Sequence, residues 1–255
     1  MKKAIIYTLL FVAIQALLPV LIQQTLGLIT GTVPALDAKL MIICLTANSI
    51  AVLALFFLMR WTQVSRSYVR SRPWAVLFWC ALAAAGAVIP STWLQEQMPE
   101  LPNFAEQEFD MILKDRWGYL AVGLLAPVCE ELVFRGAVLR SLLRWAGHHW
   151  VAIAISALLF ALVHANPAQM PHAFVIGLLL GWLYYRTDSV VPGVVYHWVN
   201  NSIAYVVYNL YPDPSLRLID ILGGSQRSVA AAVLFSLFIL LPSLYQLNLR
   251  LRKAA

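Results

Sequence analysis

Charged residues are scarce in this chain of 255 residues. Only 12% of the residues are Asp, Glu, Lys or Arg, about half the share that a soluble globular domain usually carries. Hydrophobic residues make up 61% of the chain, and the mean hydropathy is +0.76. This composition argues against a soluble domain and predicts an integral membrane protein, whose helices each need about 20 apolar residues to cross a bilayer.

Cysteine and several common catalytic motifs are also rare or missing. The three cysteines, Cys44, Cys80 and Cys129, lie in apolar segments without C-x-x-C spacing, so we interpret them as small buried hydrophobic residues. The sequence has no H-E-x-x-H zinc motif and no serine in a G-x-S-x-G setting. These absences argue against a disulfide framework, a zinc protease of the H-E-x-x-H type and a serine hydrolase.

The apolar runs predict the fold class. We expect an all-α, polytopic membrane helix bundle of about eight transmembrane helices, forming a single integral membrane domain over residues 1–255. The first run is too long for a signal peptide and lacks an A-x-A cleavage site, so we expect it to remain as a helix. The fourth contains Pro127, which has no backbone N–H and tends to kink a helix. The predicted spans are about 4–22, 39–59, 74–94, 117–143, 150–166, 171–186, 190–211 and 228–246.

Basic residues predict the orientation of these spans. The net charge of +6 does not indicate nucleic-acid binding, because Lys and Arg lie at the ends of the apolar runs. Of the 18 basic residues, twelve lie at one set of ends, five at the opposite set, and Arg135 lies within a span. Because the more basic side faces the cytoplasm, we expect both termini there, in a bacterial-type cytoplasmic membrane. The expected surroundings are the lipid bilayer, with no nucleic-acid partner.

Three charged residues interrupt the fourth run, in the stretch "PVCEELVFRG". A charge at mid-membrane costs about 2.5–3.5 kcal/mol on insertion scales, so such residues are candidates for function. Glu131 and Arg135 are four residues apart and can pair on one face of a helix. Glu130 is rotated by about 100° and is left free. In the alternative interpretation, all three residues lie near the helix end and reach water.

Two histidines lie in later apolar runs. His164 follows Phe160 by four residues, and His197 precedes Asn201 by four, so each pair shares a helix face. Alone, either histidine is more simply a packed core residue, and a His–Asn pair can be a contact between helices. Glu130 and His164 are equidistant from the polar turn "WAGHHW", which predicts equal depth in a helical hairpin. His197 fits this depth poorly, because it closely follows the predicted start of its span.

Taken together, these residues form a pattern. E-E-x-x-x-R, F-x-x-x-H and H-x-x-x-N on successive membrane segments resemble the CPBP family, the CAAX-protease and bacteriocin-processing (Abi) intramembrane endopeptidases. The resemblance covers about residues 115–210, which we expect to be the catalytic core. It implies hydrolysis of a peptide bond in a membrane-associated peptide or protein substrate.

The resemblance also implies roles for individual residues. Glu130 and His164 are expected to activate a water molecule, and His197 and Asn201 to stabilise the oxyanion. The residues expected to support them are Glu131, Arg135 and Phe160.

The cofactor remains open on sequence grounds. We favour a metal-free glutamate protease, because Asn201 suits a hydrogen-bond donor better than a metal ligand. The alternative is a zinc site with Glu130, His164 and His197 as three ligands and an open fourth position. Two other functional classes also remain. One is a catalytically silent membrane scaffold or partner-binding protein of the same fold. The other is a proton-coupled transporter, although no internal repeat of the kind common in transporters is visible.

Overall fold

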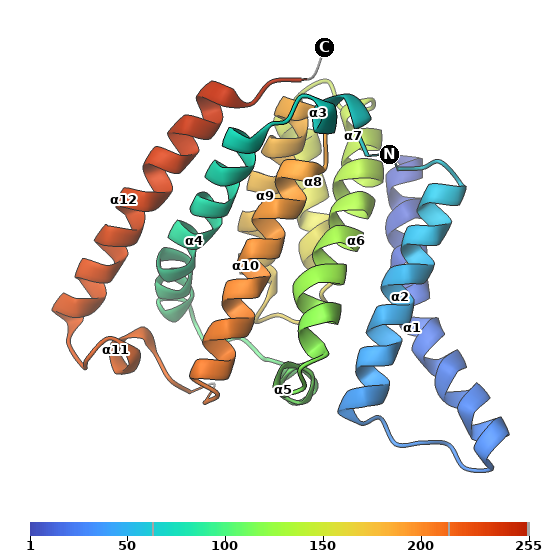
Figure 1. The fold of residues 1–255 in the computed structure, drawn as a ribbon. Helices are drawn as coiled ribbons and strands as arrows, with labels where there is room; N and C mark the ends of the chain where they lie inside the picture. The colour runs from blue at the N-terminus through green and yellow to red at the C-terminus, as the bar shows by residue number, and fades with distance from the viewer. Residues whose placement is uncertain (63, 214, 254–255) are drawn as a thin grey trace.

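The computed structural model describes residues 1–62, 64–213 and 215–253, and within these ranges all regular structure is helical (Figure 1). Each of the eight predicted spans is a helix, which confirms the predicted fold class. Seven are α-helices: α1 (Lys2–Thr30), α2 (Ala38–Leu58), α4 (Trp74–Glu96), α8 (His149–Leu162), α9 (Met170–Thr187), α10 (Val191–Leu210) and α12 (Gln226–Arg250). The eighth is a composite helix of η1 (Tyr119–Leu125), α6 (Ala126–Val133), η2 (Phe134–Leu139) and α7 (Arg140–Leu143). Short helices α3 (Arg66–Arg70), α5 (Glu106–Lys114) and α11 (Leu218–Ile221) lie between them.

The outer helices have the length and surface of membrane spans. In the described ranges, α1, α2, α4 and α12 are each long and apolar enough to cross a bilayer, and α8 is a shorter apolar helix. Large apolar side chains point away from the protein on these helices; Leu28 is 87% exposed and Phe238 is 76% exposed. Such surfaces are stable only against an apolar surrounding, as expected for an integral membrane protein.

The middle of the composite helix is enclosed by other helices, whereas Leu120 and Leu124 of η1 are each 38% exposed. It runs between α2 and α10, with α8 and α9 behind it (Figure 1). Every residue of η2 is buried, and Phe134 packs against Phe11 of α1 and Phe160 of α8. The segment with the charged residues therefore lies in the interior of the bundle, where side chains from several helices can reach it.

Pro127 widens the composite helix without ending it. The turns before it, η1, are π-helical, and the Ala126 N–H donates to the carbonyl of Ala121, five residues back. Pro127 has no N–H to donate. In an α-helix the carbonyl of Val122 would accept from the N–H of Ala126, but that N–H bonds to Ala121. In a π-helix it would accept from residue 127, which is the proline. The carbonyl of Val122 therefore has no backbone donor from either position. A side chain from another helix can therefore bond to it.

Both termini lie at the same end of the bundle (Figure 1), which is consistent with an even number of crossings. We predict that reporters fused to either terminus will give cytoplasmic signals, because basic residues gather at that end. A reporter inserted in residues 31–37, between α1 and α2, should give the opposite signal. Paired fusions to a fluorescent protein and a periplasmic phosphatase would measure this. Opposite signals at the two termini would contradict the predicted topology.

Candidate active site

An ion pair between Glu131 and Arg135 lies at the centre of the site. Arg135 Nη1 donates to Glu131 Oε1 at 2.8 Å, and the two side chains are 1% and 0% exposed. Arg135 Nη2 also donates to the carbonyl of Gly177 in α9 at 3.3 Å, and the guanidinium lies 4.4 Å from the centre of the Phe160 ring. The pairing predicted from the four-residue spacing is present. The alternative in which these side chains reach water is wrong for both residues.

The same carboxylate holds His197. The Nδ1 atom of His197 lies 3.1 Å from Glu131 Oε1. Because a carboxylate accepts hydrogen bonds, Nδ1 carries the proton. The opposite ring nitrogen, Nε2, faces Glu130 and lies 3.8 Å from its Oε2. The Glu130 side chain is 19% exposed, which makes it the more accessible of the two adjacent carboxylates.

His197 therefore reaches Glu130, and the predicted mismatch in depth is wrong. The reason lies in the turn that precedes α10. Thr187 and Ser189 are each 1% exposed and Val190 is 2% exposed, so the turn packs against the protein on this side, although Asp188 is exposed. Thr62 and Val190 both pack at Gly136 of the composite helix, and Thr62 is itself buried. Because α10 begins below the surface, its second turn already lies level with Glu130.

His164 lies just beyond a helix end. The predicted span 150–166 is too long, because α8 ends at Leu162 and His164 lies in the following turn. The backbone N–H groups of Val163 and His164 bond to Leu159 and Ala161, so neither uses the carbonyl of Phe160. His164 Nδ1 donates to that carbonyl at 2.8 Å. A carbonyl only accepts, so Nδ1 carries a proton, and in the neutral imidazole Nε2 then keeps its lone pair.

Phe160 lies between the charged groups and the histidines. Its ring packs edge-on against His164 and His197, with ring centres 4.9 and 5.8 Å apart, and Arg135 lies over its face. The ring is 1% exposed. Phe160 therefore fixes the spacing between the two imidazoles without bonding to either through its side chain.

Asn201 bonds to the carbonyl that Pro127 leaves available. Its Nδ2 donates to Val122 at 3.1 Å, and its Oδ1 accepts from Asn200 at 3.3 Å. One of its two amide hydrogens is used at Val122, and the second can serve another acceptor. The side chain of Asn201 thus bonds to a carbonyl that the π-helical turn leaves without a backbone donor, and this bond links η1 to α10.

Metal ligands are not gathered in this arrangement. Among the residues that the structure describes, no three His, Cys, Asp or Glu side chains lie together as a possible metal site. Glu130, His164 and His197 are ligand types that suit zinc, but the structure does not group these three as a possible metal site.

Residues 113–203 match a family model described as type II CAAX prenyl endopeptidase Rce1-like. The chain carries an Rce1-like region. The matched residues include all three motifs and cover the composite helix, α8, α9 and most of α10, so the resemblance to CAAX-type intramembrane proteases is confirmed. No curated protein and no solved structure matched the chain.

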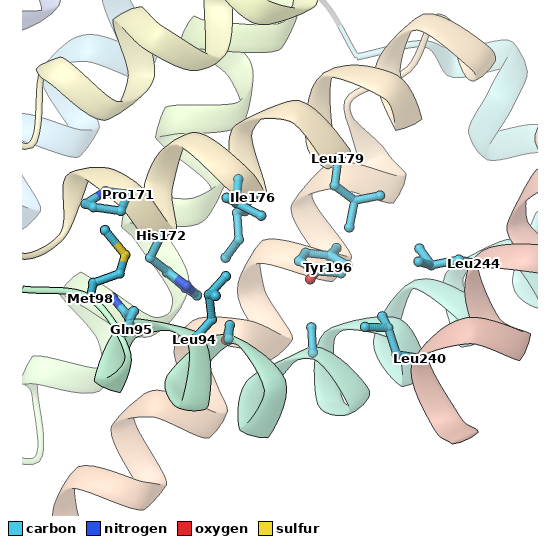
Figure 2. A pocket seen from close by; sticks show the side chains of 13 residues that line it. Leu94, Gln95, Met98, Pro171, His172, Ile176, Leu179, Tyr196, Leu240 and Leu244 are labelled. Carbon is cyan, nitrogen blue, oxygen red and sulfur yellow. The ribbon is translucent and has the colours of Figure 1, made fainter. Parts of the chain in front are cut away.

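The Rce1-like region contains features that sequence analysis missed. A Cβ placed on Gly193 would lie 2.7 Å from Glu131 Oε2, so only glycine lets α10 approach the buried carboxylate. Beside the site, α4, α9, α10 and α12 enclose an apolar cavity of about 240 Å³ (Figure 2). His172 points into this cavity and Tyr196, the neighbour of His197, lines it. For the close approach at Gly193, the sequence offers one signal: a glycine in the first turn of α10, where most other residues are bulky.

Loss of Arg135 should strongly destabilise the Rce1-like region. We predict that Arg135→Leu lowers the free energy of unfolding by about 3–5 kcal/mol, because it leaves a buried carboxylate without its partner. Lys114→Leu is a matched control: it removes another pair with the same spacing and the same 2.8 Å distance, but with side chains 58% and 37% exposed. It should have little effect. Denaturation in detergent measures both. Equal effects would contradict the importance of burial.

Adding one methyl group at Gly193 should disturb the site. We predict that Gly193→Ala displaces the Glu131 carboxylate and lowers cleavage of a membrane-anchored peptide by about 10²-fold, the scale expected for a displacement of about 1 Å at a catalytic site. Gly147→Ala is the control, because a Cβ there meets nothing within 4 Å. Wild-type cleavage rates for Gly193→Ala would show that the carboxylate can move without consequence.

Proposed function

We propose that this protein is an intramembrane endopeptidase that hydrolyses a peptide bond in a membrane-associated peptide or protein. One observation carries the proposal: Glu131 holds His197 with Nε2 facing the accessible carboxylate of Glu130, 3.8 Å away. The proposal takes Glu130 as the base and His197 as a hydrogen-bond donor, and their contact inside the helix bundle supports it. The Rce1-like match supports the same class of reaction.

Glu130 and His164 would activate the water. An ionised carboxylate and the lone pair on His164 Nε2 are both acceptors, and a water molecule has two hydrogens to donate. Glu130 would take one proton as the water oxygen bonds to the carbonyl carbon. The same proton would then pass to the amide nitrogen as the C–N bond breaks. Atoms and charge balance without a further reactant.

His197 and Asn201 would stabilise the oxyanion. His197 Nε2 can donate only if the ring is a cation, because Nδ1–H is already bonded to Glu131. A doubly protonated His197 ring is therefore part of the proposal. The second amide hydrogen of Asn201 supplies another donor. Fixed donors of this kind are most effective where water is excluded.

We propose a metal-free reaction, and no step above passes through a metal. Asn201 acts as a donor to a backbone carbonyl, in keeping with a hydrogen-bonding role. We place the protein in a bacterial-type cytoplasmic membrane with both termini in the cytoplasm, as its basic residues predict. Its partners would be the lipid bilayer and the substrate.

Glu130→Gln should abolish proteolysis. The amide cannot accept the proton of the attacking water, and loss of a general base typically lowers the rate by about 10²–10⁴-fold. Cleavage of a panel of membrane-anchored peptides by the purified protein would measure this. Glu108→Gln, a change at an exposed glutamate of α5, is the matched control and should keep full activity.

A strong chelator, added to each sample, distinguishes a metal-free reaction from a zinc-dependent one. Unchanged cleavage is expected for the metal-free reaction, whereas loss of cleavage would favour zinc held by Glu130, His164 and His197. Full activity of Glu130→Gln would contradict the proposed base. Absence of cleavage by the wild-type protein across the panel would favour a catalytically silent scaffold.

A further inference from the structure

The buried side chain of Asn166 links the turn that carries His164, residues 163–169, to the chain between α4 and α5, residues 97–105. We call residues 97–105 the outer segment. Asn166 is 1% exposed, whereas its neighbours in the turn are exposed or half-buried. Its Nδ2 donates to Asn103 Oδ1 at 2.8 Å, and its Oδ1 accepts from the Phe104 N–H at 3.1 Å. A backbone bond at 3.2 Å, from Ala168 to the carbonyl of Pro102, reinforces the contact.

Few apolar contacts hold that outer segment in place. The chain between α4 and α5 forms no regular helix through residues 97–105, and Met98, Leu101 and Phe104 are 38%, 37% and 70% exposed. A segment held by hydrogen bonds with little apolar burial opens at low free-energy cost. The Asn166 bonds therefore account for much of what fixes its position.

Behind the segment lie two neighbouring cavities. A cavity of about 420 Å³ lies between the outer chain and the turn, with Met98 and Leu101 on one side and Ala168 and Pro171 on the other. It shares Gln95, Met98 and Pro171 with the apolar cavity of Figure 2, where these three residues lie together at one end. The His164 turn is thus flanked by open space and is not supported by dense packing there.

Asn166 also sets the path of the backbone next to His164. Ala165, between the two, has a φ of 51°, a left-handed conformation that a residue with a Cβ rarely adopts. The carbonyl of Asn166 accepts from the N–H groups of Gln169 and Met170 as the chain enters α9. The position of Asn166 therefore determines how the turn between α8 and α9 is held.

We infer that Asn166 is a positioning residue for His164. Through Asn103 and Phe104 it holds the turn in the conformation in which His164 Nδ1 bonds to Phe160 and Nε2 is available. An asparagine fits because it donates and accepts at once, whereas alanine would leave the Phe104 N–H and Asn103 Oδ1 without these partners. The catalytic consequence rests on the proposed function, but the effect on the imidazole does not.

The test compares purified full-length Asn166→Ala, Asn103→Ala, the double variant and the wild type. Asn209→Ala is the matched control, because it removes a different cross-link, the bond from Asn209 Nδ2 to the carbonyl of Leu113 at 3.2 Å. The first measurement needs no substrate: the rate at which diethyl pyrocarbonate modifies His164, followed by peptide mass spectrometry. We expect a several-fold higher rate for Asn166→Ala, a smaller increase for Asn103→Ala, and no change for Asn209→Ala.

The second measurement is cleavage, at a temperature well below every melting point. We expect kcat to fall about tenfold for Asn166→Ala with KM little changed, because a misplaced His164 affects chemistry more than binding. The double variant should be no worse than Asn166→Ala, because both changes break one interaction. Equal His164 modification rates in Asn166→Ala and Asn209→Ala would overturn the inference, as would an unchanged kcat. A wild-type protein that cleaves nothing would overturn the proposed function, while the modification rates would still decide the role of Asn166.

Discussion

One buried oxygen atom, Oε1 of Glu131, organises the site by accepting from both Arg135 and His197. A charge at this depth has no water to solvate it, so the pair is stable only if its partners stay in place. Arg135 extends the network to α9 through the carbonyl of Gly177, and Gly193 allows α10 to approach from the other side. Three helices are thereby held around one carboxylate, and the orientation of His197 follows from that.

A second constraint comes from backbone groups that lack their usual partners. In a membrane, a carbonyl without a donor is costly, so irregular turns survive only where something else bonds to them. Pro127 and the π turns leave the Val122 carbonyl available, and Asn201 bonds to it. The end of α8 leaves the Phe160 carbonyl available, and His164 bonds to it. Two residues of the proposed mechanism are thus held by irregular backbone: Asn201 by a turn in a neighbouring helix, and His164 by the end of the helix that it follows.

The distance along the chain between contacting residues explains which features the sequence could predict. The Glu131–Arg135 pair and the Phe160–His164 contact depend on residues four apart, so helical periodicity is enough to find them. The position of His197 depends on the burial of Thr187, Ser189 and Val190 before α10, and Val190 packs with Thr62 at Gly136. Asn166 was missed because its partners, Asn103 and Phe104, are more than 60 residues away along the chain. No local pattern reports a contact of that range.

The two adjacent glutamates show how one helical step can separate two chemical tasks. Glu131 is fully buried and accepts hydrogen bonds from both Arg135 and His197, so its geometry suits it to orient other groups. Glu130, rotated by about 100°, is 19% exposed and faces Nε2 of His197, where the proposed mechanism needs a proton to arrive and leave. Exchanging the two environments would place the mobile proton where no water or substrate can reach it. In the proposed mechanism, the base at position 130 therefore depends on the buried carboxylate at position 131, and this dependence would explain why two glutamates are adjacent.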